Sequence, residues 1–320
     1  GYSPDGSQIV SGGEDGTVRV WDAASGNETA RLEGHDCDEN GMCDVRSVGF
    51  SADGTQIVSG GQDGTVRVWD AASGAQVAQL EDHGCVLNRN CGVSSVGFSP
   101  DGSQIVSGGD DGTVRVWDMA NGNETAQLAG HAGGVWSVGY SPDGSQIVSG
   151  GQDGTVRVWD VASGEQAAQL AGHAGIVVSV GFSPDGSQIV SGGQDGTVRV
   201  WDAASGAQTA QLAGHAGGVW SVGYSPDGSQ IVSGGQDGTV RAWDAASGAQ
   251  TAQLEGHAGI VFSVGLSPDG SQIVSGGEDG TVRVWDAASG VQTAKLAGHA
   301  DWVLSVGYSP DGSQIVSGGE

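Results

Sequence analysis

The chain has 320 residues, of which 61 are glycine and only 7 are proline. Lysine and arginine number 11 against 38 acidic residues, so the formal net charge is −27. This balance excludes nucleic acid and anionic lipid as main partners, because both require clustered basic residues. No run of about 18 apolar residues is present, so we predict no membrane insertion.

An internal repeat organises the sequence. The dipeptide Trp-Asp recurs seven times, at spacings of 48, 48, 42, 42, 42 and 42 residues. A histidine recurs with it, at positions 35, 83, 131, 173, 215, 257 and 299. A period of this length is typical of architectures in which each repeat packs against its neighbours.

Each repeat carries four short strand signals in chain order. In the copy that begins at Gly130, the expected strands cover residues 135–140, 146–149, 155–159 and 166–170. The first strand ends at a Ser-Pro-Asp-Gly turn, and Asp153-Gly154 joins the second strand to the third as a two-residue hairpin. No segment has helical spacing. Four antiparallel strands repeated seven times predict an all-β fold, a seven-bladed β-propeller of four-stranded antiparallel blades.

The elements Gly-His, Ser-Pro-Asp-Gly, Asp-Gly and Trp-Asp, in this order, resemble the WD40-repeat β-propeller family along the whole chain. The resemblance implies a single propeller over residues 1–320, closed by pairing of its N- and C-terminal segments. Residues 307–320 repeat residues 1–14 letter for letter, so we expect residues 302–308 to supply the missing innermost strand of the first blade. The strand copy at 314–319 is then surplus, or the chain is one stretch of a longer repeat array.

Every repeat also contains His, Ser and Asp, which a hydrolase could use as a catalytic triad. The resemblance implies a structural role instead, a buried tetrad in which these three side chains and the Trp of the Trp-Asp pair satisfy one another. Seven stabilising networks suit seven blades better than seven catalytic centres would, so we expect no enzymatic activity. The expected tetrads are His131, Ser149, Asp153 and Trp159; His35, Ser59, Asp63 and Trp69; the sets beginning at His83, His173, His215 and His257; and, across the ring closure, His299 with Ser11, Asp15 and Trp21.

Three positions vary between otherwise similar repeats: the residue before the first strand, the second residue of that strand, and the residue before the hairpin Asp. The resemblance places all three on the top rim, around the central channel, where partners bind. Side chains at the first two range from Gly to Trp, a change of volume that a packed core tolerates poorly; the alternative is that the aromatic residues only fill the core. The expected partner-binding rim is Arg46, Trp136, Ile176, Val178, Trp220, Ile260, Phe262, Trp302 and Leu304, and the third position reads Glu14, Gln62, Asp110, Gln152, Gln194, Gln236 and Glu278.

Two loop insertions, at residues 36–44 and 84–92, hold all four cysteines of the chain. Four cysteines allow three pairings, and the bonds within each loop, Cys37–Cys43 and Cys85–Cys91, are the simplest. A zinc site is the alternative, although five residues between cysteines exceed the usual ligand spacing. Disulfides favour an extracellular or other oxidising compartment, whereas most of the family is intracellular.

The first loop also fits the pattern D-x-D-x-N-G-x-x-D. Oxygen ligands at this spacing suit calcium, although no bidentate Glu follows at position 12; an acidic, solvated loop is the alternative. The candidate ligands are the side chains of Asp36, Asp38, Asn40 and Asp44 and the backbone carbonyl of Met42. Asn27 and Asn123 each begin an N-glycosylation pattern.

These features together predict a non-enzymatic interaction scaffold that binds a protein, peptide or other ligand on its top rim. The alternative is a structural segment of a longer extracellular repeat array or filament, whose partners are copies of itself. Mass measurement of the intact native chain discriminates between the two.

Overall fold

The computed structural model describes residues 1–37, 43–81, 83 and 92–319, and every regular element in them is a β-strand. None of these residues belongs to a helix with the length and apolar character needed to cross a membrane. The structure divides into two compact units. Unit 1 is Gly1–Asp153 with Arg157–Ala167, and unit 2 is Gly154–Val156 with Ala168–Glu320.

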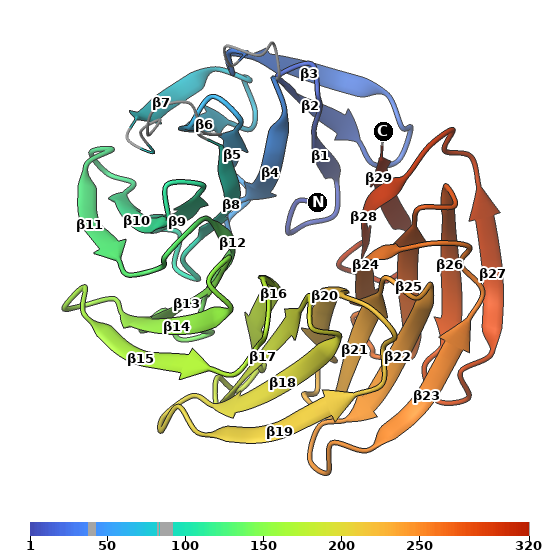
Figure 1. Cartoon of the computed structure of the whole chain (residues 1–320). Coiled ribbons are helices and arrows are strands. Elements are labelled where there is room, and N and C mark those ends of the chain that lie inside the picture. The colour runs from blue at the N-terminus through green and yellow to red at the C-terminus, as the bar shows by residue number, and fades with distance from the viewer. Residues whose placement is uncertain (38–42, 82, 84–91, 320) are drawn as a thin grey trace. The chain divides into compact units, whose positions relative to one another are not determined.

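Unit 1 contains a three-stranded antiparallel sheet, blade 1, followed by four-stranded antiparallel sheets, blades 2 to 4, whose strands pair in chain order (Figure 1). Blade 4 contributes residues to both units. The strands are β1 (Gln8–Gly12), β2 (Thr17–Asp22) and β3 (Glu28–Glu33); β4 (Val45–Phe50), β5 (Gln56–Gly61), β6 (Thr65–Asp70) and β7 (Gln76–Glu81); β8 (Val93–Phe98), β9 (Gln104–Gly109), β10 (Thr113–Asp118) and β11 (Glu124–Ala129); and β12 (Val135–Tyr140), β13 (Gln146–Gly151), β14 (Thr155–Asp160) and β15 (Gln166–Ala171).

Unit 2 continues with three further four-stranded blades, 5 to 7, and ends in a two-stranded sheet. Its strands are β16 (Val177–Phe182), β17 (Gln188–Gly193), β18 (Thr197–Asp202) and β19 (Gln208–Ala213); β20 (Val219–Tyr224), β21 (Gln230–Gly235), β22 (Thr239–Asp244) and β23 (Gln250–Glu255); β24 (Val261–Leu266), β25 (Gln272–Gly277), β26 (Thr281–Asp286) and β27 (Gln292–Ala297); and β28 (Val303–Tyr308) and β29 (Ile315–Gly319). The predicted four-stranded antiparallel repeat is therefore confirmed, and the second to fourth strands run one or two residues further than the sequence pattern indicated.

Local hydrogen bonds explain why the strands turn where they do. In the Ser-Pro-Asp-Gly turn of blade 4, Asp143 Oδ1 accepts bonds from Ser141 Oγ at 2.6 Å and Ser145 N at 3.0 Å. Gly144 donates its N–H to Ser141 O at 2.9 Å and has φ of +72°, a conformation that costs glycine nothing and other residues much. The same turn recurs in every blade because the same five residues, or close equivalents, recur there.

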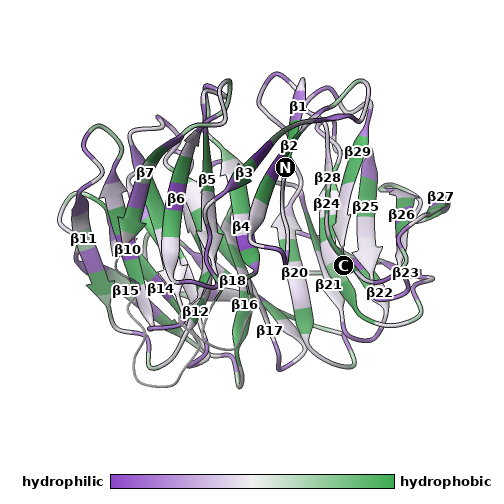
Figure 2. Ribbon diagram, turned by 90° about the horizontal axis from the view of Figure 1, so that it is seen from above, coloured by the Kyte–Doolittle hydropathy of each residue, from purple (hydrophilic) through white to green (hydrophobic). Residues whose placement is uncertain are grey.

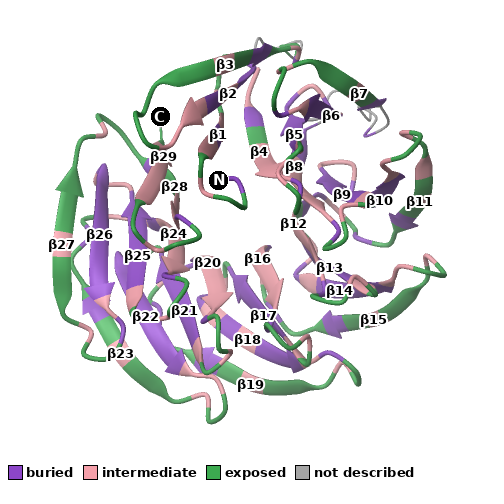
Figure 3. Ribbon diagram, turned by 180° about the vertical axis from the view of Figure 1, so that it is seen from behind, coloured by how far each residue is buried: buried purple, intermediate pink, exposed green. Residues whose placement is uncertain are grey.

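The hydrophobic core lies between successive blades. In unit 2, Val190, Val198 and Leu212 of blade 5 pack with Val219, Ile231 and Trp243 of blade 6, all buried. Along these strands hydrophobic residues alternate with hydrophilic ones (Figure 2), and the second and third strands are the most buried while the fourth strands β23 and β27 are largely exposed (Figure 3). Within each unit the Trp of a Trp-Asp pair covers the blade that precedes its own, as shown by Trp69, Trp117, Trp159, Trp243 and Trp285.

Within each unit a first-strand serine joins neighbouring blades, a role that the sequence analysis missed. Ser179 Oγ of β16 accepts the N–H of Val222 of β20 at 3.2 Å, and Ser221 Oγ accepts the N–H of Val264 at 3.2 Å. The only signal in the sequence is that the third residue of the first strand is Ser in every repeat.

The expected exchange of the innermost strand is wrong. Strand β28 pairs with β29, with Tyr308 opposite Ile315, and β1 pairs with β2. The reason is loop-closure entropy, because a short turn connects β28 to β29, as in every other blade, whereas β1 lies some 300 residues away in the sequence. Within unit 1, Gly1 and Tyr2 lie beside β1, through hydrogen bonds between Gly1 and Val10 and a bridge from Tyr2 to Ile9.

The two-stranded end leaves part of blade 7 uncovered. Leu254 of β23 is 2% exposed because blade 7 packs over it, whereas the equivalent Leu296 of β27 is 48% exposed. The sheet β28–β29 covers the inner strands of blade 7 through Val303 and Val306, but it contains no third and fourth strands that could cover Leu296.

Glycines at the ends of the second strands give a first prediction. A Cβ on Gly277 would lie 2.6 Å from His257 Nδ1 and 3.0 Å from Ile260 O, so Gly277→Ala must displace a buried histidine. We expect the free energy of unfolding to fall by about 1–3 kcal/mol. The control is Gly265→Ala in β24, where the nearest atom is Val274 Cγ1 at 3.6 Å. Urea unfolding measures both, and equal stabilities for the two variants would contradict the packing described here.

Candidate functional site

The His, Ser, Asp and Trp side chains of one repeat meet inside its blade. In blade 4, Trp159 Nε1 donates to Ser149 Oγ at 2.9 Å, and His131 Nε2 lies 2.8 Å from the same oxygen. His131 Nδ1 lies 3.0 Å from Asp153 Oδ1. The same three contacts, within about 0.1 Å, occur in the sets of His35, His83, His173, His215 and His257.

Protonation gives the network of blade 4 a direction. Burial lowers the pKa of His131 and outweighs the hydrogen bond and charge of Asp153, which raise it, so the imidazole is neutral at pH 7. The aspartate can only accept, so the proton of the neutral ring is on Nδ1, which donates to Asp153. Nε2 is then an acceptor, so the Ser149 hydroxyl donates to it, while the Ser149 oxygen accepts the indole N–H of Trp159.

The aspartate also anchors the backbone around it. Asp195 Oδ1 accepts the N–H of Thr197 at 3.1 Å, and its Oδ2 accepts the N–H of Ala174 at 2.9 Å. Burial alone would raise the pKa of Asp195, but the bonds from His173, Ala174 and Thr197 lower it to about 2. One carboxylate thus joins the start of the third strand to the loop that follows the histidine.

An arginine extends each complete network, a feature that the sequence analysis also missed. Nη2 of Arg283 in β26 lies 3.3 Å from Asp279 Oδ2, and Nη1 of the same side chain donates to Gln292 Oε1 at 2.7 Å. The side chain is 8% exposed. The signal in the sequence is an Arg at the third residue of every third strand.

These networks cannot act as catalytic triads. The serines of the complete sets, Ser59, Ser107, Ser149, Ser191, Ser233 and Ser275, are all 0% exposed. A nucleophile must reach its substrate, and each of these oxygens is already committed to an indole and an imidazole.

The expected tetrad across the ring closure is wrong. His299 Nε2 contacts Ser317 Oγ at 2.8 Å, a serine of its own terminal sheet. Trp21 still donates to Ser11 Oγ at 2.9 Å, and Asp15 pairs with Arg31 at 2.9 Å. The cause is the pairing of β28 with β29, which places Ser317 where Ser149 lies in blade 4.

The variable positions lie at the loop end of the first strands. The first-strand valines Val135, Val177, Val219, Val261 and Val303 are 0% exposed. Residues next to these valines in the chain are exposed: Trp136 is 41% exposed, Trp302 38% and Leu304 43%. Ile176, Val178, Trp220, Ile260 and Phe262 are half-buried. We call these residues, with Arg46, the rim residues.

The residue before the hairpin Asp holds the loop that precedes the first strand. Gln236 Oε1 accepts the N–H of Gly218 at 3.2 Å, and Glu278 Oε2 accepts the N–H of Ile260 at 2.9 Å. Asp110 Oδ2 accepts the N–H of Gly92 at 3.1 Å in the same way. Gln, Glu and Asp all fit this position because each offers an oxygen that holds the loop before the first strand.

Between blades 2 and 3 the rim carries an ion pair. Arg46 Nη1 lies 3.0 Å from Asp110 Oδ2 and donates to Ser94 Oγ at 3.4 Å, so a cation of blade 2 pairs with an anion of blade 3. Arg46 and Asp110 are each the only residue of their type at their position in the repeat. The sequence shows that both residues depart from the repeat, but it does not show that their side chains pair.

In unit 2 the rim is aromatic. The ring centroids of Trp220 and Phe262 are 5.8 Å apart with an interplanar angle of 77°, and those of Phe262 and Trp302 are 5.4 Å apart. Such edge-to-face and tilted pairs are favourable geometries for aromatic rings. We call Trp220, Phe262 and Trp302 the aromatic stack.

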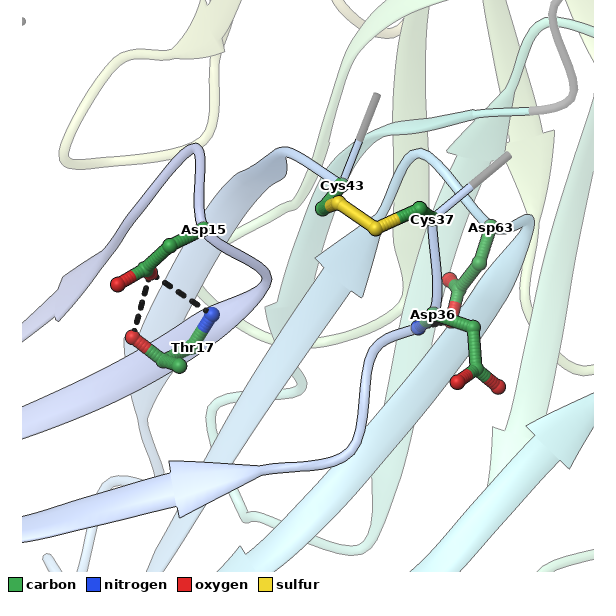
Figure 4. The surroundings of a disulfide bond; sticks show 6 residues. All are labelled: Asp15, Thr17, Asp36, Cys37, Cys43 and Asp63. Atoms are coloured by element: carbon green, nitrogen blue, oxygen red, sulfur yellow. Dashed lines mark hydrogen bonds between the residues drawn. A yellow bond between two sulfur atoms is a disulfide. The ribbon is translucent and has the colours of Figure 1, made fainter. Parts of the chain in front are cut away.

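The first cysteine loop is closed by a bond between Cys37 and Cys43 (Figure 4). At the base of the loop the N–H of Asp36 donates to Asp63 Oδ2 at 3.0 Å. Cys85 and Cys91 of the second loop lie outside the described residues.

The calcium site stays a prediction. Of its five candidate ligands, Asp38, Asn40 and Met42 lie outside the described residues. The carboxylate of Asp36 is 89% exposed and turns away from the disulfide (Figure 4), with Arg67 Nη2 at 3.9 Å. Among the described residues no group of three His, Cys, Asp or Glu side chains could hold a metal ion. If the loop binds calcium, titration calorimetry of the oxidised protein gives heat that Asp38→Ala removes; equal heats from both proteins would exclude the site.

Comparison with known families agrees with this geometry. A family model of the fourth β-propeller of WDR90 matches residues 44–181 and 92–222, and the model of the WD domain, G-beta repeat, matches residues 1–22, 206–244, 248–286 and 290–320. The chain belongs to the WD40-repeat β-propeller family. No curated protein matches it. WD40 propellers are in general non-enzymatic scaffolds that bind other proteins, which agrees with the buried serines of the tetrads.

Proposed function

We propose that this WD40 protein is an interaction scaffold that binds a protein or peptide through its rim residues. The observation that carries the proposal is the contrast at the loop end of the first strands, where large apolar side chains stand exposed beside fully buried valines. Within unit 2, Trp220, Phe262 and Trp302 also gather in contact with one another. Exposed apolar patches are typical of binding sites, and Trp is enriched among residues that dominate binding energy.

The tetrads support this proposal by keeping the rim rigid. Each tetrad aspartate fixes the loop that follows its histidine, as Asp195 does through the N–H of Ala174. The residue before the hairpin Asp fixes the end of the same loop. A surface held in advance loses less conformational entropy when a partner binds.

The Cys37–Cys43 bond bears on where such binding takes place. Disulfides persist in oxidising compartments and are rare in the cytosol. We therefore propose a partner that is extracellular or lies in another oxidising compartment.

Alanine variants of the exposed tryptophans test the function. We expect Trp136→Ala and Trp302→Ala together to remove the partners that the native protein captures, while the melting temperature changes little, because both side chains are largely exposed. Val77→Ala and Val291→Ala are the controls, since these exposed residues lie outside the rim, and they should leave capture intact. Capture that survives the tryptophan variants, or a large fall in their melting temperature, would overturn the proposal.

A further inference from the structure

We propose that the aromatic stack binds a cationic side chain, of Lys or Arg, presented by a basic segment of the partner. This inference rests on the proposed function and names the partner chemistry of one part of the rim. All residues of the proposed site lie in unit 2.

The first support is the stack itself. The ring centroids of Trp220 and Phe262 are 5.8 Å apart, and those of Phe262 and Trp302 are 5.4 Å apart. The face of an aromatic ring carries negative potential, and a cation within about 6 Å of a ring centroid is attracted to it, most strongly by Trp. Trp302 is exposed, so a cation can reach its ring.

The second support is the negative charge beside the rings. Glu278 Oε2 accepts the N–H of Ile260, and its Oε1 has no hydrogen-bond partner among the described residues. Asp301 precedes Trp302 and is exposed, with Oδ1 accepting the N–H of Trp302 at 2.9 Å. The turn that follows Glu278 lies against the loop of Asp301. A Cβ added to Gly280 in that turn would lie 3.0 Å from the backbone oxygen of Asp301.

The third support is that the described part of unit 2 brings no cation of its own to this place. Its basic residues are Arg199, Arg241, Arg283 and Lys295, which lie on the third and fourth strands β18, β22, β26 and β27. The three arginines are held there by tetrad aspartates and by glutamines, as Arg241 is by Asp237 and Gln250. With a net charge of −27 on the whole chain, a basic segment is the electrostatically complementary partner.

Unit 1 provides an internal comparison. There one of the two acidic residues before a hairpin Asp, Asp110, is neutralised by Arg46 from the preceding blade. In unit 2 the corresponding acidic residue is Glu278, and the residue that corresponds to Arg46 in the preceding blade is Trp220. At the repeat position where unit 1 has the guanidinium of Arg46, unit 2 therefore has the indole of Trp220. In our proposal a cation of the partner takes the role toward Glu278 that Arg46 has toward Asp110.

Stability does not explain the stack. The indole Nε1 of Trp220 is buried and has no hydrogen-bond partner among the described residues. A buried donor without an acceptor is costly for the fold. Val178 at the same position of blade 5 carries no such donor.

Short peptides test the inference on the full-length oxidised protein. The probes are three acetylated, amidated peptides of nine residues, composed of Gly and Ser except for a central Arg, Gln or Leu. Indole N–H signals of the ¹⁵N-labelled protein report binding, with Trp302→Phe and Trp136→Phe assigning the two exposed indoles. We expect the Arg peptide to shift the Trp302 signal in a saturable, salt-sensitive way, and the Gln and Leu peptides and the Trp136 signal to show no such effect.

Two variants sharpen the test. Glu278→Gln keeps an oxygen for the N–H of Ile260, as Gln236 does for Gly218, but removes the charge. Phe262→Leu removes the central ring and keeps an apolar side chain. Each should weaken binding of the Arg peptide by roughly two- to thirty-fold, the range for a cation on an aromatic face.

The outcomes separate the two proposals. The cationic preference is wrong if the Leu or Gln peptide shifts the Trp302 signal as strongly as the Arg peptide does, or if no peptide shifts it. In that case, loss of capture in the tryptophan variants would still uphold the rim residues as a binding surface. If the Arg peptide binds and both variants weaken it, but capture survives the tryptophan variants, the stack is a cation site and the proposed scaffold function is wrong. Binding that Glu278→Gln and Phe262→Leu leave unchanged also overturns the inference.

Discussion

Replacing Trp159 with Phe should lower the free energy of unfolding by about 1–3 kcal/mol, because the buried Ser149 hydroxyl then loses the indole N–H that it accepts at 2.9 Å. Phe keeps most of the ring that packs in the cluster of Val106, Val114 and Ile147. The hydrogen bond is therefore the main difference between the two proteins. Urea unfolding measures the loss, and amide hydrogen exchange locates it in blade 4.

The matched control lies in the same blade. Trp136→Phe makes the same chemical change on a side chain that is 41% exposed. It should leave the unfolding free energy within about 0.5 kcal/mol of the native value, as surface substitutions usually do. If Trp159→Phe proves no more destabilising than Trp136→Phe, the tetrad adds nothing measurable to the stability of the blade.

Acid should destabilise the protein in two stages, and the histidines cause the first. Burial lowers the pKa of His131, His173, His215 and His257 below 6.5 in the folded state. The unfolded chain therefore binds more protons than the folded protein as the pH falls through about 6.5, and the free energy of unfolding decreases.

The tetrad aspartates cause the second stage. Burial acts to raise the pKa of Asp111, but the hydrogen bond and charge of His83 and the bonds from Thr113 bring it to about 2; the pKa of Asp195 is also about 2. A carboxyl whose pKa is lower in the folded state contributes stability above the unfolded pKa of about 3.9, and this contribution is lost as the pH falls toward the folded pKa. The sign is the same as for the histidines, so the two losses add.

Urea unfolding between about pH 8 and pH 3 checks the expectation, with the decline beginning near the ordinary histidine pKa and steepening near that of aspartate. A stability that stays constant from about pH 7 to pH 5 would contradict neutral, buried imidazoles in the folded protein. His215→Gln serves as a comparison, because it removes one titrating ring and should flatten the first stage by that ring's share.

The amino-acid sequence by itself determined the elements of this protein and the interior of each blade. Strand β12 begins and ends at the predicted residues, because the alternation from Val135 to Tyr140 and the Ser-Pro-Asp-Gly turn are local signals. The membership of the tetrads followed from the resemblance to the WD40-repeat family, because several Ser and Asp residues recur with each Trp and the pattern alone does not choose among them. In both cases the physical cause acts within one repeat, and the repeat carries it every time.

The tertiary structure decided what depends on a choice between identical segments or on contacts between blades. Residues 8–13 and 314–319 have the same sequence, so no residue pattern could show that β28 pairs with the nearer copy and that His299 contacts Ser317. Contacts between blades decided that Asp110 forms an ion pair with Arg46, and that the rings of Trp220, Phe262 and Trp302 contact one another. These residues are far apart in the chain, and only the packing of one blade on the next brings their side chains within reach of each other.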